Sequence, residues 1–240
     1  MSEIDLSLVL ACYNEEKIFL ESVKDITKTL DNTKINYEVI FVDDCSKDNT
    51  RELIKLACEK DNKLRYIFHE KNKGRGGAVK TGFNAAKGVV AGFIDIDLET
   101  PAYHIPQLYQ EVMENYDVVT GLRIYSFDIT GIPRDISSIV YRKLAKLLIN
   151  MQAKDSETGC KFFNRKKLLD LLPFTPNNGW FWDTEIMMAA YLNGYKIKEM
   201  PTLFIRKVKQ KGSTVKLWTD SYEYFLRLLE YRKKLKEKTI

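Results

Sequence analysis

The stretch VVAGFIDID, residues 89–97, joins six residues without a polar side chain directly to two aspartates. A continuous apolar run of this kind is typical of a strand that is buried on both faces. Residues two apart in extended backbone point to the same side, so Asp95 and Asp97 should project together from the strand end. Two carboxylates and substrate phosphates are the usual oxygen ligands of Mg²⁺ or Mn²⁺.

Two further apolar runs also end in polar residues. Residues 6–12 read LSLVLAC and lead to Tyr13-Asn14-Glu15, and residues 37–42 read YEVIFV and lead to Asp43-Asp44. In open α/β sheets, ligands bind beyond the carboxyl ends of the strands. Three polar strand ends that meet at one crevice therefore predict a binding site.

Extended and helical patterns alternate along the chain. Strands are expected at residues 6–12, 37–42, 64–69, 89–94, 116–120 and 200–206. Helices are expected at residues 15–30, 51–60, 78–86, 105–114, 137–151, 184–193 and from about 219 onward. This alternation predicts an α/β fold with a mainly parallel sheet and helices on both faces. The length of 240 residues suits a single domain of this class.

The composition excludes several other classes of protein. Hydrophobic residues make up 45% of the chain and charged residues 30%, as in soluble globular proteins. Nothing approaches the ~20 consecutive apolar residues of a membrane span, and the N-terminus does not resemble a signal peptide. The four cysteines are widely spaced and form no Cys-x-x-Cys pair, so we expect reduced thiols in a cytoplasmic protein and no zinc site.

The net charge of +5 is unevenly distributed. The segment from Arg206 to the end contains 11 basic and 4 acidic residues, a net charge of +7, and the preceding residues carry −2. A basic segment suits a polyanion, either a diphosphate or an anionic membrane surface, and we expect no nucleic acid. A solvated helix end is the alternative interpretation.

A glycine-rich loop, NKGRGGA at residues 72–78, precedes one of the predicted helices. Glycine lets the backbone approach a ligand closely, and the N–H groups at a helix start favour anions. The loop is not a Walker motif, and no Gly-x-Gly-x-x-Gly follows the first strand. A surface turn without a ligand is the alternative.

These segments, in this order and spacing, resemble family 2 glycosyltransferases with the GT-A fold. Three later segments resemble the branch that acts on dolichyl or polyprenyl phosphate: DSETGCKFF (155–163), WFWDTE (180–185) and GSTVK (212–216). The resemblance extends from Leu6 to about Arg232. It departs from the family pattern at Ala11, usually proline, at Glu99, glutamine in some relatives, and at Trp182, usually phenylalanine.

The resemblance implies a fold, a division of the chain and a set of roles. It implies one GT-A domain at residues 1–218, with a nucleotide-binding half at about 1–123 and an acceptor half at about 124–218, and a basic amphipathic helix at 219–240. The nucleotide is expected on Ala11, Tyr13, Glu15, Asp43 and Asp95. Other expected substrate contacts are Asp44, Lys73, Gly76, Ile96, Arg206 and Ser213. Asp97, together with Asp95 or Glu99, is expected to hold Mg²⁺ or Mn²⁺.

The remaining expected catalytic residues lie in the second half of the chain. Guanidinium groups match phosphate oxygens, so Arg123, Arg134 and Arg206 are candidates for the acceptor phosphate or the donor diphosphate. Asp183 or Glu185 would act as general base if the acceptor were a hydroxyl.

Several of these residues also have a structural interpretation. Of Asp43 and Asp44, we expect one to bind ligand and the other to begin a helix. Asp183 could cap its helix instead of acting as a base. Trp180 and Trp182 could stack on a sugar or lie in the core.

The predicted activity is the inverting transfer of a hexose from a UDP- or GDP-sugar to a polyprenyl phosphate, by a protein peripheral at the cytoplasmic membrane face. Transfer to a saccharide or another hydroxyl acceptor is one alternative. A non-catalytic protein that binds nucleotide sugars is another.

Overall fold

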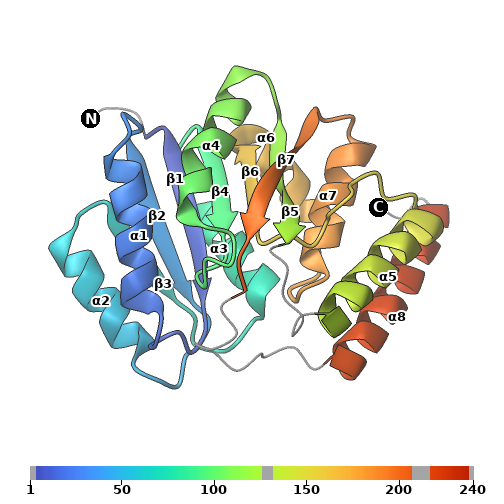
Figure 1. Cartoon of the computed structure of the whole chain (residues 1–240), viewed down its shortest axis with the longest axis horizontal. Coiled ribbons are helices and arrows are strands. Elements are labelled where there is room, and N and C mark those ends of the chain that lie inside the picture. Colours follow the sequence, from blue (N-terminus) through green and yellow to red (C-terminus); the bar gives the residue numbers. More distant parts are fainter. Residues whose placement is uncertain (1–3, 126–131, 207–216, 238–240) are drawn as a thin grey trace.

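The computed structural model describes residues 4–125, 132–206 and 217–237, with the backbone alone for residues 132–137 and 217–223. One seven-stranded sheet is covered by helices on both faces (Figure 1). The strands are β1 (Leu6–Cys12), β2 (Tyr37–Asp43), β3 (Leu64–Phe68), β4 (Val90–Ile94), β5 (Val118–Tyr125), β6 (Cys160–Asn164) and β7 (Ile197–Phe204). The helices are α1 (Phe19–Asp31), α2 (Thr50–Lys60), α3 (Arg75–Ala85), α4 (Ile105–Glu114), α5 (Ile132–Ile149), α6 (Arg165–Leu171), α7 (Trp182–Leu192) and α8 (Leu217–Lys236).

The sheet has the strand order β3-β2-β1-β4-β6-β5-β7. Strand β6 pairs antiparallel with both β4 and β5, whereas the other pairs are parallel. The carboxyl ends of β1, β2, β4, β5 and β7 therefore lie at the same edge. This arrangement confirms the predicted α/β fold with a mainly parallel sheet.

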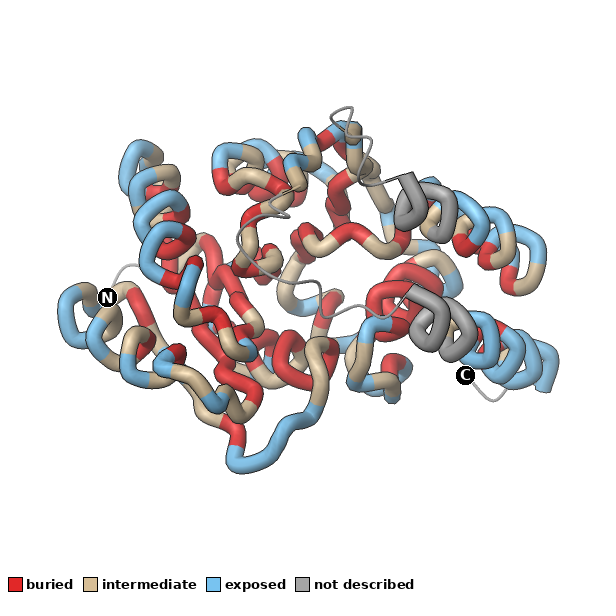
Figure 2. Tube along the Cα trace, turned by 60° about the horizontal axis from the view of Figure 1, so that its bottom comes forward, coloured by how far each residue is buried: buried red, intermediate tan, exposed pale blue. Residues whose placement is uncertain are grey.

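Two hydrophobic cores, one on each face, hold the helices to the sheet. Leu6, Leu8 and Leu10 of β1 pack with α1, α2 and α4, whereas Val9 packs with α3 and α5 to α8. This alternation is the two-residue period of a strand that is buried on both faces. Figure 2 shows the buried residues gathered in the interior and the exposed residues on the outer sides of the helices.

The main departure from the predicted elements is the region around β6. Neither β6 nor α6 was predicted, and β5 extends to Tyr125 instead of ending at Thr120. Helix α3 begins at Arg75, three residues before the predicted start, so Gly76 and Gly77 lie inside it. No helix in the described ranges combines the length and apolar character needed to cross a membrane.

The turns after β1, β2 and β4 have unusual backbone geometry. Asn14, Cys45 and Leu98 have φ angles of 57°, 68° and 50°. Non-glycine residues adopt this left-handed region rarely, and such residues cluster at ligand sites and switch regions. The irregular backbone coincides with the three strand ends that the sequence indicates as a site.

Candidate functional site

The ends of β1 and β2 are bound to each other through their turns. The Asp44 N–H donates to the Cys12 carbonyl at 2.8 Å, and the Asn14 N–H donates to Ser46 Oγ at 2.9 Å. The Glu15 N–H donates to Thr50 Oγ1 at 2.7 Å. These bonds fix the two turns side by side, with Tyr13 at the surface.

Asp43 is fully buried and uses one carboxylate oxygen to anchor itself. Its Oδ2 accepts from the N–H groups of Cys45 and Ser46, both at 3.1 Å, and from Arg51 Nε at 2.6 Å. Its Oδ1 has no hydrogen-bond partner among the described residues. A buried acceptor without a partner is costly, so Asp43 Oδ1 is suited to receive a donor from a ligand.

Asp44 instead holds the loop that precedes helix α3. Its Oδ1 and Oδ2 accept from the N–H groups of Lys73 and Gly74, both at 2.8 Å, and His69 Nδ1 donates to Oδ1 at 2.7 Å. These two N–H groups precede the first residue of α3, Arg75, so the expectation that the helix-start N–H groups bind a ligand anion stays a prediction. The two adjacent aspartates differ in their contacts, because both oxygens of Asp44 are bound by the loop before α3, whereas Asp43 uses one oxygen alone.

Asp95, Asp97 and Glu99 are all partly exposed and alternate with the buried residues Ile96 and Leu98. The segment is a turn and not extended backbone, since β4 ends at Ile94 and the Leu98 N–H donates to the Asp95 carbonyl at 3.1 Å. Within the described residues, no group of three or more His, Cys, Asp or Glu side chains is placed to hold a metal ion. Two carboxylates with substrate phosphates remain a sufficient ligand set for Mg²⁺ or Mn²⁺.

Asp95 also contacts Arg75. Its Oδ1 accepts from Arg75 Nε at 2.8 Å and lies 2.7 Å from Nη2. Burial raises the pKa of Asp95 to about 6, although the Arg75 guanidinium opposes the change. The main chain of Asp95 donates to the Gly159 carbonyl at 2.9 Å, which ties the end of β4 to the residue before β6.

Asp183 is neither a free base nor a helix cap. Its Oδ2 accepts from Arg75 Nη1 and its Oδ1 from Lys161 Nζ, both at 2.6 Å. The N-cap of α7 is Phe181, and that end has no side-chain cap. The expectation that Asp183 caps its helix is therefore wrong, whereas its role as a base stays a prediction for a carboxylate that two cations engage.

Glu185 contacts the loop before α7 and lies near cations of α3 and α8. Its Oε2 accepts from the Asn177 N–H at 2.8 Å, and burial raises its pKa. Lys80 of α3 and Lys234 of α8 are among the cations near it. Residues two apart on a helix point in nearly opposite directions, so Glu185 faces away from Asp183 and the Arg75–Asp95 contact.

The two tryptophans differ in position. Trp182 is fully buried and packs on Phe83 and Phe93, so it is a core residue. Trp180 is 42% exposed, and the Arg75 guanidinium carbon lies 4.9 Å from the centroid of the Trp180 ring. Of Trp180 and Trp182, Trp180 is the one available to contact a ligand.

The predicted phosphate-binding arginines have different positions. Arg123 forms a two-pronged ion pair with the buried Asp155, with Nε and Nη2 each 2.7 Å from a carboxylate oxygen. Its guanidinium is therefore paired within the protein, and its expected role as a phosphate ligand stays a prediction. Arg206 lies over Tyr125 and Phe204, which pair at the ends of β5 and β7. The Arg134 side chain and Ser213 lie outside the described residues.

Two further expected contacts have structural roles. A Cβ at Gly76 would lie 2.6 Å from Trp182 Cβ and 2.7 Å from the Gly179 carbonyl oxygen, so glycine lets α3 pack on the loop before α7. The Ile96 side chain is in the core, which leaves only its backbone for a ligand. Ala11 lies in β1 opposite Val42.

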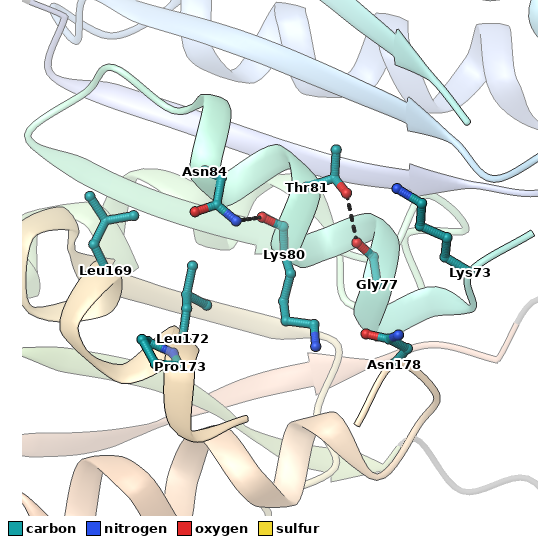
Figure 3. Close-up of a pocket in the computed structure, with 9 residues that line it drawn as sticks. All are labelled: Lys73, Gly77, Lys80, Thr81, Asn84, Leu169, Leu172, Pro173 and Asn178. Carbon is teal, nitrogen blue, oxygen red and sulfur yellow. Dashed lines mark hydrogen bonds between the residues drawn. The ribbon is translucent and has the colours of Figure 1, made fainter. Parts of the chain in front are cut away.

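A separate pocket of about 420 Å³ lies between α3 and the segment that follows α6 (Figure 3). Lys80 Nζ donates there to the Thr175 and Asn177 carbonyls at 2.8 and 3.0 Å. The pocket is lined by Lys73, Gly77, Lys80, Thr81, Asn84, Leu169, Leu172, Pro173 and Asn178. None of the strand-end carboxylates lines it, although Lys73, one of the expected substrate contacts, does.

Arg75 and Lys161 received no role from the sequence, although both are central to the site. Lys161 is a fully buried lysine in a strand of apolar residues, and lysines are almost never fully buried without a partner. That placement within CKFFN was the one signal that could have identified it.

The model of glycosyl transferase family 2 matches residues 7–172. Glycosyltransferase AglD of Haloferax volcanii is 30% identical over 203 residues, which cover 82% of this chain and 32% of AglD. Undecaprenyl-phosphate 4-deoxy-4-formamido-L-arabinose transferase of Aeromonas hydrophila is 33% identical over 162 residues, or 65% of this chain and 47% of that protein. Dolichyl-phosphate beta-glucosyltransferase of Saccharomyces cerevisiae is 28% identical over 241 residues, which cover 91% of this chain and 71% of that protein. The chain thus spans about a third and about half of the first two relatives.

Solved structures share the fold. Glucosyl-3-phosphoglycerate synthase from Mycobacterium tuberculosis, in complex with Mn²⁺, UDP and glucosyl-3-phosphoglycerate, has a TM-score of 0.72 at 20% identity. The match covers 95% of this chain and 79% of that one. Mannosyltransferase PcManGT from Pyrobaculum calidifontis, in complex with GDP-Man and Mn²⁺, has a TM-score of 0.60 at 17% identity and covers 88% and 59%. At these identities the likeness shows the fold alone.

Proposed function

The chain belongs to glycosyl transferase family 2, and from this premise we propose that it transfers a hexose from a UDP- or GDP-sugar to a polyprenyl phosphate, with inversion. The observation that carries the proposal is the presence of three partly exposed carboxylates directly after β4, at the sheet edge where β1 and β2 also end. The acceptor class is supported by two relatives that are named for undecaprenyl phosphate and dolichyl phosphate.

The donor would lie across the ends of β1, β2 and β4. Asp43 Oδ1, the buried acceptor without a partner, would bind a donor group of the base or ribose. Asp95 and Asp97 would hold Mg²⁺ or Mn²⁺, which supplies charge neutralisation to the departing nucleoside diphosphate. The Mn²⁺ with UDP or GDP-Man in two structural neighbours supports this choice of metal and donor.

The state of the acidic residues in α7 favours a phosphate acceptor over a hydroxyl. A hydroxyl nucleophile needs a general base within hydrogen-bond reach, either directly or through one water. Asp183 is engaged by two cations, and Glu185 faces Asn177 and the cations of α3 and α8. A phosphate is already ionised near neutral pH and needs no base. Arg206, at the ends of β5 and β7, is the candidate contact for that phosphate.

Nucleotide release by the purified protein tests the proposal. UDP- and GDP-sugars are supplied with Mg²⁺ or Mn²⁺, with a short polyprenyl phosphate present or absent. The expected result is release of UDP or GDP that depends on both metal and polyprenyl phosphate. Turnover with hydroxyl acceptors alone would favour the alternative acceptor class. Donor binding without turnover on any acceptor would favour a non-catalytic binding protein.

Helix α8 would bring the enzyme to an anionic lipid surface at the cytoplasmic face of a membrane. Leu228 and Tyr231 fix the helix to the core, whereas apolar and basic residues share its exposed sides: Phe225, Leu226, Leu229, Arg232, Lys233 and Lys234. Apolar area combined with lysine and arginine is the pattern of interfacial helices. Cosedimentation with anionic vesicles, compared with neutral vesicles, tests this surface, and equal binding to both would contradict it.

We also keep the proposed division of the chain. Residues 1–123 would form the nucleotide-binding half, 124–218 the acceptor half and 219–240 the basic helix. The division is supported by the site itself, since the donor-side carboxylates precede residue 124 and Arg206 follows it.

A further inference from the structure

Four charged side chains of alternating sign form a continuous series of ion pairs in the interior, beside the site. Lys161 contacts Asp183, Asp183 contacts Arg75, and Arg75 contacts Asp95, with N–O distances of 2.6 to 2.8 Å. The side chains of Lys161, Asp183 and Arg75 are only 0%, 4% and 10% exposed. These four residues belong to β6, α7, α3 and the end of β4, so the ion pairs connect four elements that are labelled in Figure 1.

The surroundings allow little freedom to these charges. The Arg75 guanidinium lies between the rings of Phe93 and Trp180, 5.2 and 4.9 Å from their centroids. Lys161 Nζ also donates to the Thr158 carbonyl at 2.5 Å and lies 5.4 Å from the Phe93 centroid. Buried charges of this kind are costly unless they are paired, so each depends on its neighbour in the series.

Arg75 is shared between two acids, and this sharing determines how it holds Asp95. Asp183 attracts Arg75 through Nη1, whereas Asp95 attracts it through Nε and Nη2. Lys161 neutralises Asp183 from the other side and so limits the pull of Asp183 on Arg75. Removing the charge of Lys161 should therefore draw Arg75 toward Asp183 and weaken its hold on Asp95.

We propose that Lys161 and Asp183 are positioning residues that act through Arg75 to set the place of the Asp95 carboxylate for donor binding. The inference rests on the proposed function, which gives Asp95 to the donor nucleotide and its metal. It assigns Asp183 a role other than proton transfer. It also predicts that the effects of changing Lys161 and Asp183 are not additive.

The test compares donor affinity in Lys161→Met, Asp183→Asn and the double variant. Calorimetry with UDP or GDP and Mn²⁺ gives the dissociation constant without any turnover. Lys161→Met is expected to weaken nucleotide binding about tenfold, within the range of coupling between neighbouring charges. The double variant, in which Asp183 no longer competes for Arg75, is expected to recover to within about threefold of the wild type.

A matched control separates positioning from general loss of stability. Arg65 pairs with Glu38 at 2.7 Å, between β3 and β2 and apart from the series of ion pairs. Arg65→Met should lower the unfolding temperature without changing nucleotide affinity. Lys161→Met should change nucleotide affinity but leave the KM for polyprenyl phosphate unchanged.

The inference would be overturned if Lys161→Met binds nucleotide as the wild type does, or if the double variant binds as weakly as Lys161→Met. If Lys161→Met does not fold, nucleotide binding by Arg75→Lys supplies a second test of the inference. Lysine keeps the charge but cannot bridge Asp95 and Asp183, so weaker nucleotide binding is expected and unchanged binding overturns the inference. Failure of the wild type itself to bind UDP or GDP would contradict the proposed function instead.

Discussion

Arg75 Nη1 lies 2.6 Å from Asp183 Oδ2, although the two residues are 108 positions apart in the sequence. The contact joins the start of α3 to the start of α7. Because the same guanidinium also contacts Asp95, the end of β4 and the first turn of α7 are held in one arrangement. The donor-side carboxylates are thus supported by residues from the second half of the chain.

Replacement of Gly159 by alanine should displace Asp95. A Cβ at Gly159 would lie 1.8 Å from Asp95 Oδ2, far inside contact distance. Overpacking of this kind costs about 1–3 kcal/mol, and urea unfolding of Gly159→Ala should show that loss. Nucleotide binding should also weaken. Gly179→Ala is the control, because among the described residues the atom that its Cβ would meet is Asn177 Oδ1, at 3.4 Å. Unchanged stability and nucleotide affinity in Gly159→Ala would contradict the geometry of Asp95.

Asp97→Ala should abolish metal-dependent turnover. The proposed metal stabilises the transition state by several kcal/mol, so a loss of at least about 10²-fold in kcat/KM is expected. Nucleotide release in the presence of Mn²⁺ measures it, with thermal unfolding to confirm that the variant is folded. Asp25→Ala, an exposed residue of α1, is the matched control. Equal activity in Asp97→Ala and the wild type would remove Asp97 from the site.

Arg123→Met should destabilise the protein in a pH-dependent way. Burial alone would raise the pKa of Asp155, but Arg123 holds that pKa below its ordinary value. The pair therefore stabilises the fold above the unfolded pKa of about 3.9, and this stabilisation is lost as the pH falls through the lowered folded value.

Removing Arg123 leaves the buried Asp155 with Arg142, 4.0 Å away, as its cation, at a cost of about 3–5 kcal/mol near neutral pH. The cost should shrink below about pH 4, where Asp155 can be protonated. Denaturant unfolding of the wild type and of Arg123→Met, near neutral pH and below about pH 4, measures this cost in free energy of unfolding. A destabilisation that is equal at the two pH values would count against the pair.

Glu185→Gln should retain most of its activity with a polyprenyl phosphate acceptor. The glutamine keeps the volume of the buried side chain, and an ionised phosphate needs no base. A general base contributes about 10²–10⁴-fold, so a loss of that size would identify Glu185 as a base and favour a hydroxyl acceptor. Initial rates of nucleotide release at saturating acceptor distinguish the two outcomes.

Much of the donor side could be predicted from the sequence because its signals are local. Apolar runs define β1, β2 and β4, and Asp95, Asp97 and Glu99 follow directly after the last of these strands. The different contacts of Asp43 and Asp44 also follow from their local positions. Asp43 is the last residue of β2, whereas Asp44 is the first residue of the loop that follows.

The acceptor side was harder to predict because its contacts connect distant segments. Strand β6 has only five residues and includes Lys161, so its pattern does not distinguish a strand from a loop. The pairing of Arg123 with Asp155 and of Arg75 with Asp183 depends on where the helices pack, which no local pattern contains. The expectation that Asp183 caps α7 was wrong for this reason, and the contacts of Arg123 and Gly76 within the protein were not foreseen.

The central claim, inverting transfer to a polyprenyl phosphate, is tested most directly by the structure of the product. The purified protein is incubated with Mn²⁺, a polyprenyl phosphate and the α-linked UDP- or GDP-hexose that supports nucleotide release. The product is then analysed by mass spectrometry and by NMR of its anomeric proton. The account predicts a polyprenyl phosphate that has gained one hexose in the β configuration. A sugar attached to a hydroxyl acceptor instead, or an α-linked product, would contradict it.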